Sequence, residues 1–228
     1  MPRVKIAKIL PRISLAELFS RKKCYLGISM DNPIFEGEAL KAMLLWAEQN
    51  FEQTLVIVGD YLCRFNERIM AGCNEKEAGE LSIEIGDLFF SKTKGLFAEF
   101  DAEKIRLSRW REHLRGEEFQ RAKKILDEFF KTNEEFRAAV EYDAVSFVKR
   151  QKKHERDLAV GKEEAIRLSS QYILEETAVF SSLAERGWTV ELYPGPELRV
   201  LAEAAKGRYP GLPKGLADRI NVELKISP

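Results

Sequence analysis

The sequence has few of the residues on which several common kinds of protein depend. Among its 228 residues are only two histidines, His113 and His154, and three cysteines, Cys24, Cys63 and Cys73. An odd number of cysteines without CxxC spacing argues against a disulfide framework or a zinc site, so we expect free thiols, no metal and a reducing, cytoplasmic setting. The charges balance, with 37 Lys and Arg against 37 Asp and Glu, so there is no global attraction to nucleic acid.

The sequence also lacks long apolar runs and nucleotide-binding motifs. No window approaches the length of a membrane span, and residues 1–10 alternate charged and apolar side chains, unlike the apolar core of a signal peptide. Neither a P-loop nor a GxGxxG turn occurs, and the His-x-Gly-His signature of aminoacyl-tRNA synthetases is missing. We therefore expect no membrane association and no cofactor, and nothing in the sequence implies an obligate protein partner.

What is present is an alternation of strand and helix patterns. Short runs rich in apolar and β-branched residues predict strands at 23–28, 54–58, 104–108 and 188–193. Amphipathic stretches predict helices at 35–50, 75–92, 117–131, 134–149 and 163–183, and one more that opens at 194–196 and ends at 205. This order predicts one three-layer, Rossmann-like α/β domain over 1–228 with a mostly parallel sheet. Residues 1–22 are expected to form an N-terminal arm or an edge strand, and Val222–Ile226 another edge strand.

A serine at the end of the first predicted strand is the first candidate for chemistry. Gly27 and Ser29 share one face of this strand, and a glycine lets a substrate approach the backbone closely. Ser29 falls in the turn between strand and helix, a common place for catalytic groups in α/β folds. A plain turn in which Asp31 or Asn32 caps the next helix is the alternative.

Asp60 follows the buried strand 54–58 directly after Gly59. The carboxyl ends of parallel strands form the active-site edge of such sheets, so Asp60 is a second candidate for substrate contact. The alternative is that Asp60 caps the segment Tyr61–Ala71.

Three side chains later in the chain complete a candidate site. Tyr172 and Glu176 lie four residues apart on a predicted helix and project from one face, where a carboxylate and a phenol could hold an ammonium group. Tyr193 ends a strand at the same sheet edge as Ser29, and its hydroxyl could relay a proton.

Two further residues bear on the substrate. Tyr25 shares the strand face of Gly27, and Glu191 shares that of Tyr193. If these faces line a pocket, Glu191 favours a polar or cationic substrate group. Alternatively, Glu191 points to solvent at an edge of the sheet.

These motifs, in this order, resemble those of the tRNA-dependent cyclodipeptide synthases, over about residues 23–195. The matching segments are Gly27-Ile28-Ser29 with Asn32 and Phe35, Gly59-Asp60 with Arg64, Phe65 and Asn66, Tyr172-x-x-x-Glu176, and Tyr193-Pro194. One branch of the family has the asparagine together with a Tyr-His pair, and the other has Tyr-Pro without the asparagine. Tyr193-Pro194 favours the Tyr-Pro branch, whereas Asn32 departs from it.

The resemblance implies a fold similar to the catalytic domain of class I tyrosyl- and tryptophanyl-tRNA synthetases, and an aminoacyltransferase that works without ATP. Ser29 would attack the ester of a first aminoacyl-tRNA and hold the aminoacyl group. A second aminoacyl-tRNA would supply the amine, giving a dipeptidyl enzyme that cyclises to a diketopiperazine. Glu176 and Tyr172 would grip the α-amino group, and Tyr193 would shuttle protons.

The resemblance also implies contact with tRNA. The family tends to have a basic helix after the second strand, but here that helix is acidic at Glu80, Glu84 and Asp87. Contact with tRNA would then depend on other basic residues, namely Lys92, Lys94, Arg106, Arg109, Arg111, Arg115, Lys149, Arg150, Lys152 and Lys153. The basic run 149–156 has an alternative interpretation as a solvated helix junction.

Two other functions remain open from the residues alone. A serine acyl hydrolase would need a histidine base near Ser29 and a Gly-x-Ser-x-Gly elbow, which the sequence lacks. A non-catalytic Rossmann-like module that binds tRNA or a nucleotide predicts that Ser29→Ala leaves the function intact.

Overall fold

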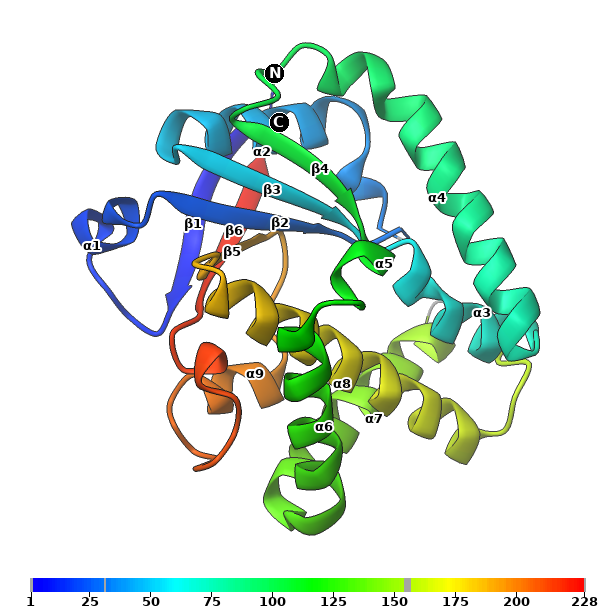
Figure 1. The fold of residues 1–228 in the computed structure, drawn as a ribbon. Helices are drawn as coiled ribbons and strands as arrows, with labels where there is room; N and C mark the ends of the chain where they lie inside the picture. The colour runs from blue at the N-terminus through cyan, green and yellow to red at the C-terminus, as the bar shows by residue number, and fades with distance from the viewer. Residues whose placement is uncertain (1, 31, 154–156, 228) are drawn as a thin grey trace.

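A six-stranded sheet with strand order β1-β6-β5-β2-β3-β4 forms the centre of the fold (Figure 1). The computed structural model describes residues 2–30, 32–153 and 157–227. The strands are β1 (Arg3–Leu10), β2 (Lys23–Ile28), β3 (Gln53–Val58), β4 (Ile105–Arg109), β5 (Val190–Tyr193) and β6 (Ile220–Ser227). Neighbouring strands pair in parallel except β1, which is antiparallel to β6. The predicted mostly parallel sheet is confirmed.

Helices cover both faces of this sheet. The α-helices are α1 (Leu15–Ser20), α2 (Gly37–Asn50), α3 (Arg64–Ala71), α4 (Glu75–Phe97), α5 (Trp110–His113), α6 (Glu117–Thr132), α7 (Glu134–Lys153), α8 (Lys162–Glu185) and α9 (Arg199–Ala204). Short 3-10 turns are η1 (Pro33–Phe35), η2 (Tyr61–Cys63) and η3 (Lys214–Leu216). One core packs α1, α2 and α4 against the sheet, and the other packs α3 and α5 to α9. The three predicted layers are therefore present.

Strand β2 shows how the sequence serves both cores. Cys24, Leu26 and Ile28 belong to the core on the α2 side, whereas Tyr25 belongs to the core on the α8 side. Because side chains alternate along a strand, a run that is apolar throughout is suited to a central strand covered on both faces. Gly27 and the residue after the strand, Ser29, line a pocket on the α8 side.

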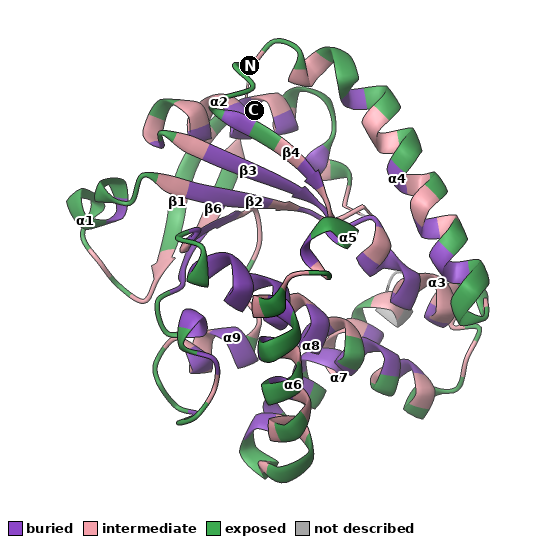
Figure 2. Ribbon diagram, in the orientation of Figure 1, coloured by how far each residue is buried: buried purple, intermediate pink, exposed green. Residues whose placement is uncertain are grey.

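Helix α8 runs through the centre of its layer, where most of its residues are buried (Figure 2). It contacts α6, α7 and α3. A helix packed on several sides has little freedom to move, so side chains near its middle are held at fixed positions relative to the sheet. Tyr172 and Glu176 project from this helix.

Two predictions near the C-terminus need correction. Strand β6 is not an edge strand: it pairs with both β5 and β1, and Val222 and Leu224 are buried. The edge position belongs to β1, whose first residue, Arg3, pairs with Ser227 at the end of β6 (Figure 1). Helix α9 begins at Arg199 rather than at 194–196. At this start, Asp143 of α7 accepts hydrogen bonds from the backbone N–H groups of Arg199 and Val200.

Within the described residues, no helix has both the length and the apolar character to span a lipid bilayer.

Candidate active site

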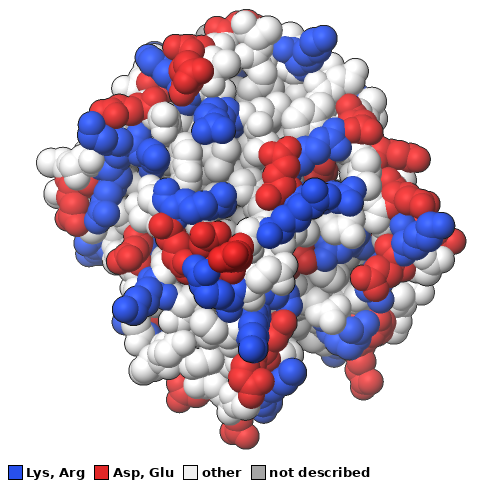
Figure 3. Space-filling model, in the orientation of Figure 1, with Lys and Arg blue, Asp and Glu red and all other residues white. Residues whose placement is uncertain are grey.

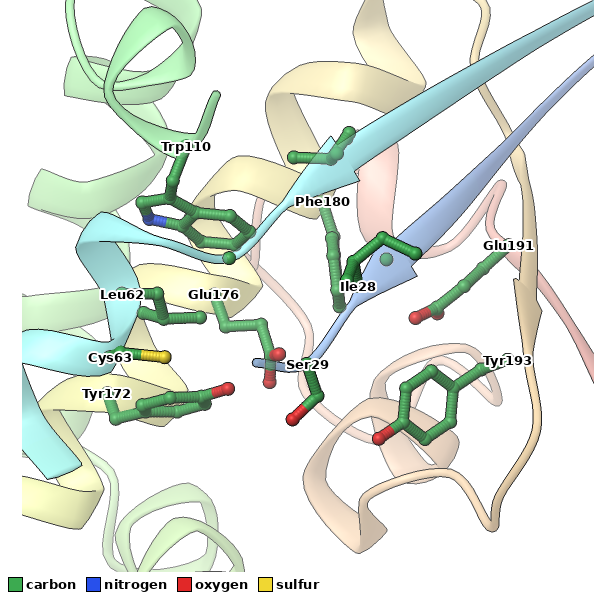
Figure 4. Close-up of a pocket in the computed structure, with 13 residues that line it drawn as sticks. Ile28, Ser29, Leu62, Cys63, Trp110, Tyr172, Glu176, Phe180, Glu191 and Tyr193 are labelled. Atoms are coloured by element: carbon green, nitrogen blue, oxygen red, sulfur yellow. The ribbon is translucent and has the colours of Figure 1, made fainter. Parts of the chain in front are cut away.

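A pocket lies at the carboxyl ends of β2, β3 and β5, the edge at which α/β sheets commonly bind ligands. It encloses about 440 Å³, counting its open mouth. Its lining comprises Gly27, Ile28, Ser29, Ile57, Gly59, Leu62, Cys63, Trp110, Tyr172, Glu176, Phe180, Glu191 and Tyr193 (Figure 4). Segments far apart in the sequence therefore bring Ser29, Tyr172, Glu176 and Tyr193 to one cavity.

Ser29 stands between two groups of polar side chains. Figure 4 shows its hydroxyl with Glu176 and Tyr172 on one side and Tyr193 on the other. Two glycines give the surroundings their shape. At Gly27 a Cβ atom would meet nothing within 4 Å, so this position is open space, whereas at Gly59 it would lie 2.9 Å from the Ile28 carbonyl oxygen. The ends of β2 and β3 thus touch at Gly59, while the pocket opens over Gly27.

Glu176 lines the pocket, is half-buried, and forms no ion pair with another described residue. Burial, and after it the negative charge of Glu191, raises the pKa of Glu176 to about 8. Tyr172 forms a hydrogen bond with this carboxyl group. Since burial disfavours the charged form, the empty pocket holds the proton near neutral pH, and an ammonium group placed there would restore the carboxylate.

Tyr193 faces Glu176 across the pocket. Burial first, and then the charge of Glu176, raises the pKa of Tyr193 to about 12, so its hydroxyl stays neutral and can both donate and accept. The Asn32 side chain forms a hydrogen bond with Tyr193. Its Oδ1 also accepts from the Ile34 N–H at 3.2 Å, capping η1. Asn32 therefore caps a helical turn and also positions Tyr193.

Glu191 lies in the pocket wall and is 5% exposed, so the solvent-facing alternative for this residue is wrong. Its strand, β5, is central rather than at an edge. Glu191 Oε2 accepts hydrogen bonds from Arg219 Nη2 at 2.6 Å and from Asn221 Nδ2 at 3.4 Å. Arg219 also donates to Glu197 Oε1, at 2.7 Å from Nη1. A buried cation thus joins two carboxylates behind the pocket.

The proposed substrate contacts of Tyr25 and Asp60 do not fit this geometry. Tyr25 is fully buried outside the lining, and its hydroxyl accepts from Arg219 Nε at 3.2 Å. Asp60 is also buried outside the lining, and its Oδ1 accepts from the backbone N–H groups of Tyr61 at 2.8 Å and Trp110 at 3.1 Å. Helix α4 passes so closely that a Cβ on Gly86 would lie 2.6 Å from Asp60 Cβ. Asp60 therefore joins the ends of β3 and β4, consistent with the capping alternative.

A second serine, Ser108, lies next to a histidine, His113, but this histidine is not in the form that could act as a general base. Ser108 Oγ lies 2.8 Å from His113 Nε2, and Arg186 Nη2 lies 3.2 Å from His113 Nδ1. Because a guanidinium only donates, Nδ1 must accept, so Nε2 carries the proton and donates to Ser108. Burial, and then the charge of Arg186, lowers the pKa of His113 to about 4. His113 therefore cannot serve as base for Ser29 or Ser108, and His154 lies outside the described residues.

On the face shown in Figure 3, Lys and Arg side chains are interspersed with Asp and Glu side chains. Arg109 pairs with Asp87 and lies 3.4 Å from Asp60, so its charge is already compensated. The exposed cations that form no ion pair with another described residue include Lys92, Lys94, Arg106, Arg111, Arg115, Lys149 and Arg150. Arg150 is near enough to the pocket to lower the pKa of Tyr193 electrostatically. The side chains of Lys152 and Lys153 lie outside the described residues.

Sequence reasoning missed several residues of the site. Trp110, Phe180, Leu62 and Cys63 line the pocket, and Arg219 supports Glu191 from behind. Trp110 had the clearest signal, because it comes two residues after the predicted strand 104–108 and so falls at the same sheet edge.

Comparison with known proteins agrees with this geometry. The family model described as "Cyclodipeptide synthase" matches residues 16–185, which span β2 to α8 and thus most of the pocket lining. The chain belongs to the cyclodipeptide synthase family. No curated protein sequence matches it.

Solved cyclodipeptide synthases have the same fold at low sequence identity. The Fluoribacter dumoffii protein has a TM-score of 0.81 at 20% identity, and the alignment covers 100% of this chain and 99% of that one. The Mycobacterium tuberculosis protein has a TM-score of 0.74 at 17% identity, with 96% and 92% covered, and is described as demonstrating a relation to type I tRNA synthetases. A protein from Candidatus Glomeribacter gigasporarum, solved bound to Phe-tRNAPhe, has a TM-score of 0.65 at 18% identity, with 89% and 86% covered. The predicted three-layer α/β fold is confirmed, and it is the fold of solved cyclodipeptide synthases.

Proposed function

We propose that this cyclodipeptide synthase uses two aminoacyl-tRNAs and no ATP, and forms a diketopiperazine through an aminoacyl ester on Ser29. The observation that carries the proposal is the meeting of Ser29, Glu176 and Tyr193 in one pocket at the carboxyl edge of the sheet. Family membership supports the reaction class, and the relative solved with Phe-tRNAPhe supports the type of substrate. Because charged tRNAs are cytoplasmic, we expect the reaction to take place in the cytoplasm.

The first step forms the Ser29 ester. The Ser29 oxygen attacks the carbonyl carbon of the aminoacyl-tRNA, the bond to the ribose oxygen breaks, and the serine proton passes to that oxygen. The substrate is already an activated ester, so transfer between two oxygens requires no nucleotide. Glu176 and Tyr172 hold the α-ammonium group of the aminoacyl moiety and thereby orient its carbonyl towards Ser29.

The second step forms the first peptide bond. A dipeptidyl enzyme forms only if the attacking amine belongs to the Ser29-bound residue, because attack by the amine of the second aminoacyl-tRNA would instead release Ser29. The amine of the Ser29-bound residue loses one proton and attacks the ester carbonyl of the second aminoacyl-tRNA. The bond to the second ribose oxygen breaks, and that oxygen takes the second proton of the amine. Burial raises the pKa of Glu176 to about 8, close to the value of an α-amino group, about 7.7 to 8.0. Transfer of the proton from ammonium to Glu176 is therefore nearly balanced in free energy, which suits Glu176 to act as the general base.

The last step closes the ring and frees the enzyme. The amine of the second residue attacks the Ser29 ester, the second amide bond forms, and the Ser29 oxygen regains a proton. Tyr193 has a neutral hydroxyl held by Asn32, so it can accept the amine proton while it donates its own to Ser29. The proton balance is then complete within the pocket.

The test is to incubate the purified protein with charged tRNAs, without ATP, and to search for diketopiperazines by mass spectrometry. We expect cyclic dipeptides from the wild-type protein and none from Ser29→Ala. A Ser29→Ala protein with undiminished product would contradict the covalent route. Binding of tRNA without any product, by a folded wild-type protein, would favour the non-catalytic binding module.

A further inference from the structure

The wall of the pocket combines apolar side chains with the carboxylate of Glu191. Ile57, Leu62, Trp110 and Phe180 contribute apolar surface, while Glu191 contributes a buried carboxylate. Figure 4 shows this carboxylate pointing into the space between Ile28 and Tyr193. The Glu191 hydrogen bonds among described residues all use Oε2. Oε1 thus remains as an acceptor for a bound molecule.

The charge of this carboxylate is already compensated. Arg219 is 1% exposed and its Nη2 lies 2.6 Å from Glu191 Oε2. Arg219 Nε also donates to Oε2, at 3.2 Å, and Asn221 adds a third N–H donor from β6. A substrate that approaches Oε1 therefore meets a hydrogen-bond acceptor whose negative charge is shared with a guanidinium. An uncharged donor satisfies this acceptor, whereas a second carboxylate would be repelled and left unpaired.

The route from Ser29 to Glu191 passes over Gly27. Tyr25 pairs in register with Glu191 on the neighbouring strand, and Gly27 and Ser29 follow Tyr25 on the same face. Ser29 comes four residues after Tyr25, the partner of Glu191. At about 3.3 Å per residue, the backbone of Ser29 therefore lies roughly 13 Å along the strand from the backbone of Glu191. Part of this distance is spanned by the Glu191 side chain and the ester group. The space over Gly27 is open, so the remainder can be filled by a long substrate side chain.

We propose that the aminoacyl group taken up by Ser29 has a long, uncharged side chain ending in an O–H or N–H donor, which lies over Gly27 and binds Glu191 Oε1. Tyrosyl, tryptophanyl and glutaminyl groups have this chemistry. Acidic side chains are rejected by the carboxylate, and aliphatic ones leave Oε1 unsatisfied. This inference rests on the proposed function, because it requires an aminoacyl group on Ser29.

The side chain can be identified from the mass of the acyl-enzyme. The wild-type protein is incubated with a full mixture of charged tRNAs, quenched in acid, and its intact mass is measured. An adduct with a long, uncharged, donor-ended side chain supports the inference. An aliphatic, acidic or cationic adduct overturns it while leaving the proposed function intact. Absence of any adduct on a folded protein contradicts the proposed function, and the inference falls with it.

Glu191→Gln offers a sharper second test. Arg219 and Asn221 donate hydrogen bonds to the Oε2 position, so the glutamine should place its amide oxygen there. Its NH₂ group then takes the Oε1 position and faces the pocket. The variant changes the pocket-facing acceptor into a donor with almost no change in shape. We expect the preferred aminoacyl-tRNA to react at least about tenfold more slowly than with wild type, since two donors would face one another. An unchanged rate would overturn the contact with Oε1.

Gly27→Ala tests the route itself. The added methyl group meets no protein atom within 4 Å, so thermal unfolding should show an intact fold. It occupies the space assigned to the substrate side chain, so we expect the acyl adducts to shift towards smaller side chains. An unchanged adduct profile in this folded variant would overturn the route over Gly27.

Discussion

The guanidinium of Arg64 and the carboxylate of Glu175 form a buried ion pair that supports one wall of the pocket. Arg64 Nη1 lies 2.8 Å from Glu175 Oε1, and the two side chains are 10% and 8% exposed. The same oxygen accepts the indole N–H of Trp110 at 2.9 Å. Arg64 also lies over the Tyr61 and Phe65 rings, 4.3 and 4.2 Å from their centroids. Trp110, which lines the pocket, is thereby held between α3 and α8.

Glu175→Ala should destabilise the protein by about 3 to 5 kcal/mol, because it leaves the buried Arg64 guanidinium without its counter-charge. Urea denaturation at neutral pH measures this change. Glu164→Ala is a matched control on the same helix, since Glu164 pairs with Arg167 at 40% and 50% exposure. We expect the control to cost at most about 1 kcal/mol. An equal loss of unfolding free energy in the two variants would show that the buried ion pair stabilises the protein no more than the exposed one.

Binding of the aminoacyl group should release a proton below about pH 8. The pKa of Glu176 is raised to about 8, so the empty site is protonated at neutral pH, whereas the complex pairs a carboxylate with an ammonium. Affinity for aminoacyl-tRNA should therefore rise by up to about tenfold per pH unit between pH 6 and 7.5. Ser29→Ala protein isolates binding from chemistry.

The control for this pH dependence is the double variant Ser29→Ala, Glu176→Gln. Its amide does not titrate, so its affinity should be weaker and nearly flat over the same range. An equally steep pH dependence in both proteins would show that another group takes up the proton.

His113 should make the protein sensitive to acid without affecting catalysis. Its pKa is lowered to about 4 by burial, whereas the unfolded chain takes up this proton near pH 6.5. The folded state therefore loses stability as pH falls from 6.5 to 4, by on the order of 3 kcal/mol.

His113→Gln lacks this proton, so its stability relative to wild type should improve steadily on acidification, as measured by urea denaturation at several pH values. Product formation at neutral pH should persist, because His113 does not line the pocket. Loss of product in a fully folded His113→Gln protein would instead favour a histidine-dependent acyl transfer.

Arg150 should contribute to tRNA binding through the phosphate backbone. It is exposed on α7 and close enough to Tyr193 to affect it electrostatically. Arg150→Ala should reduce the slope of log affinity against log salt by about 0.7 to 0.9, the value for one phosphate contact. Lys22→Ala, before β2 at the opposite edge of the sheet, is the control and should leave the slope unchanged. Equal slopes in the two variants would exclude Arg150 from the interface.

The sequence allowed prediction of those parts of the site that follow local rules. Ser29 and Tyr193 come at the carboxyl ends of parallel strands, and Tyr172 and Glu176 share a helix face, so spacing alone brought these four together. The support behind Glu191 follows no such rule. Arg219 precedes β6 and meets Glu191 only because β5 and β6 are neighbours in the sheet.

Residues adjacent in the sequence can also have different surroundings, which the sequence pattern does not distinguish. Glu175 and Glu176 are adjacent on α8, yet one forms a buried ion pair with Arg64 and the other faces the pocket. Likewise Asp60 sits at a strand end, as an active-site residue would, but tertiary packing directs it towards the backbone of Trp110. Which side of a helix or turn faces the ligand depends on the elements packed against it.

The intact mass of the protein after brief exposure to one kind of charged tRNA tests the central claim most directly. If Ser29 is the nucleophile, an acid-quenched sample should gain the mass of one aminoacyl group, and peptide mapping should locate it on Ser29. Ser29→Ala should gain nothing while still binding the tRNA. Diketopiperazine formation without an acyl group on Ser29, or an adduct that persists in Ser29→Ala, would contradict the account.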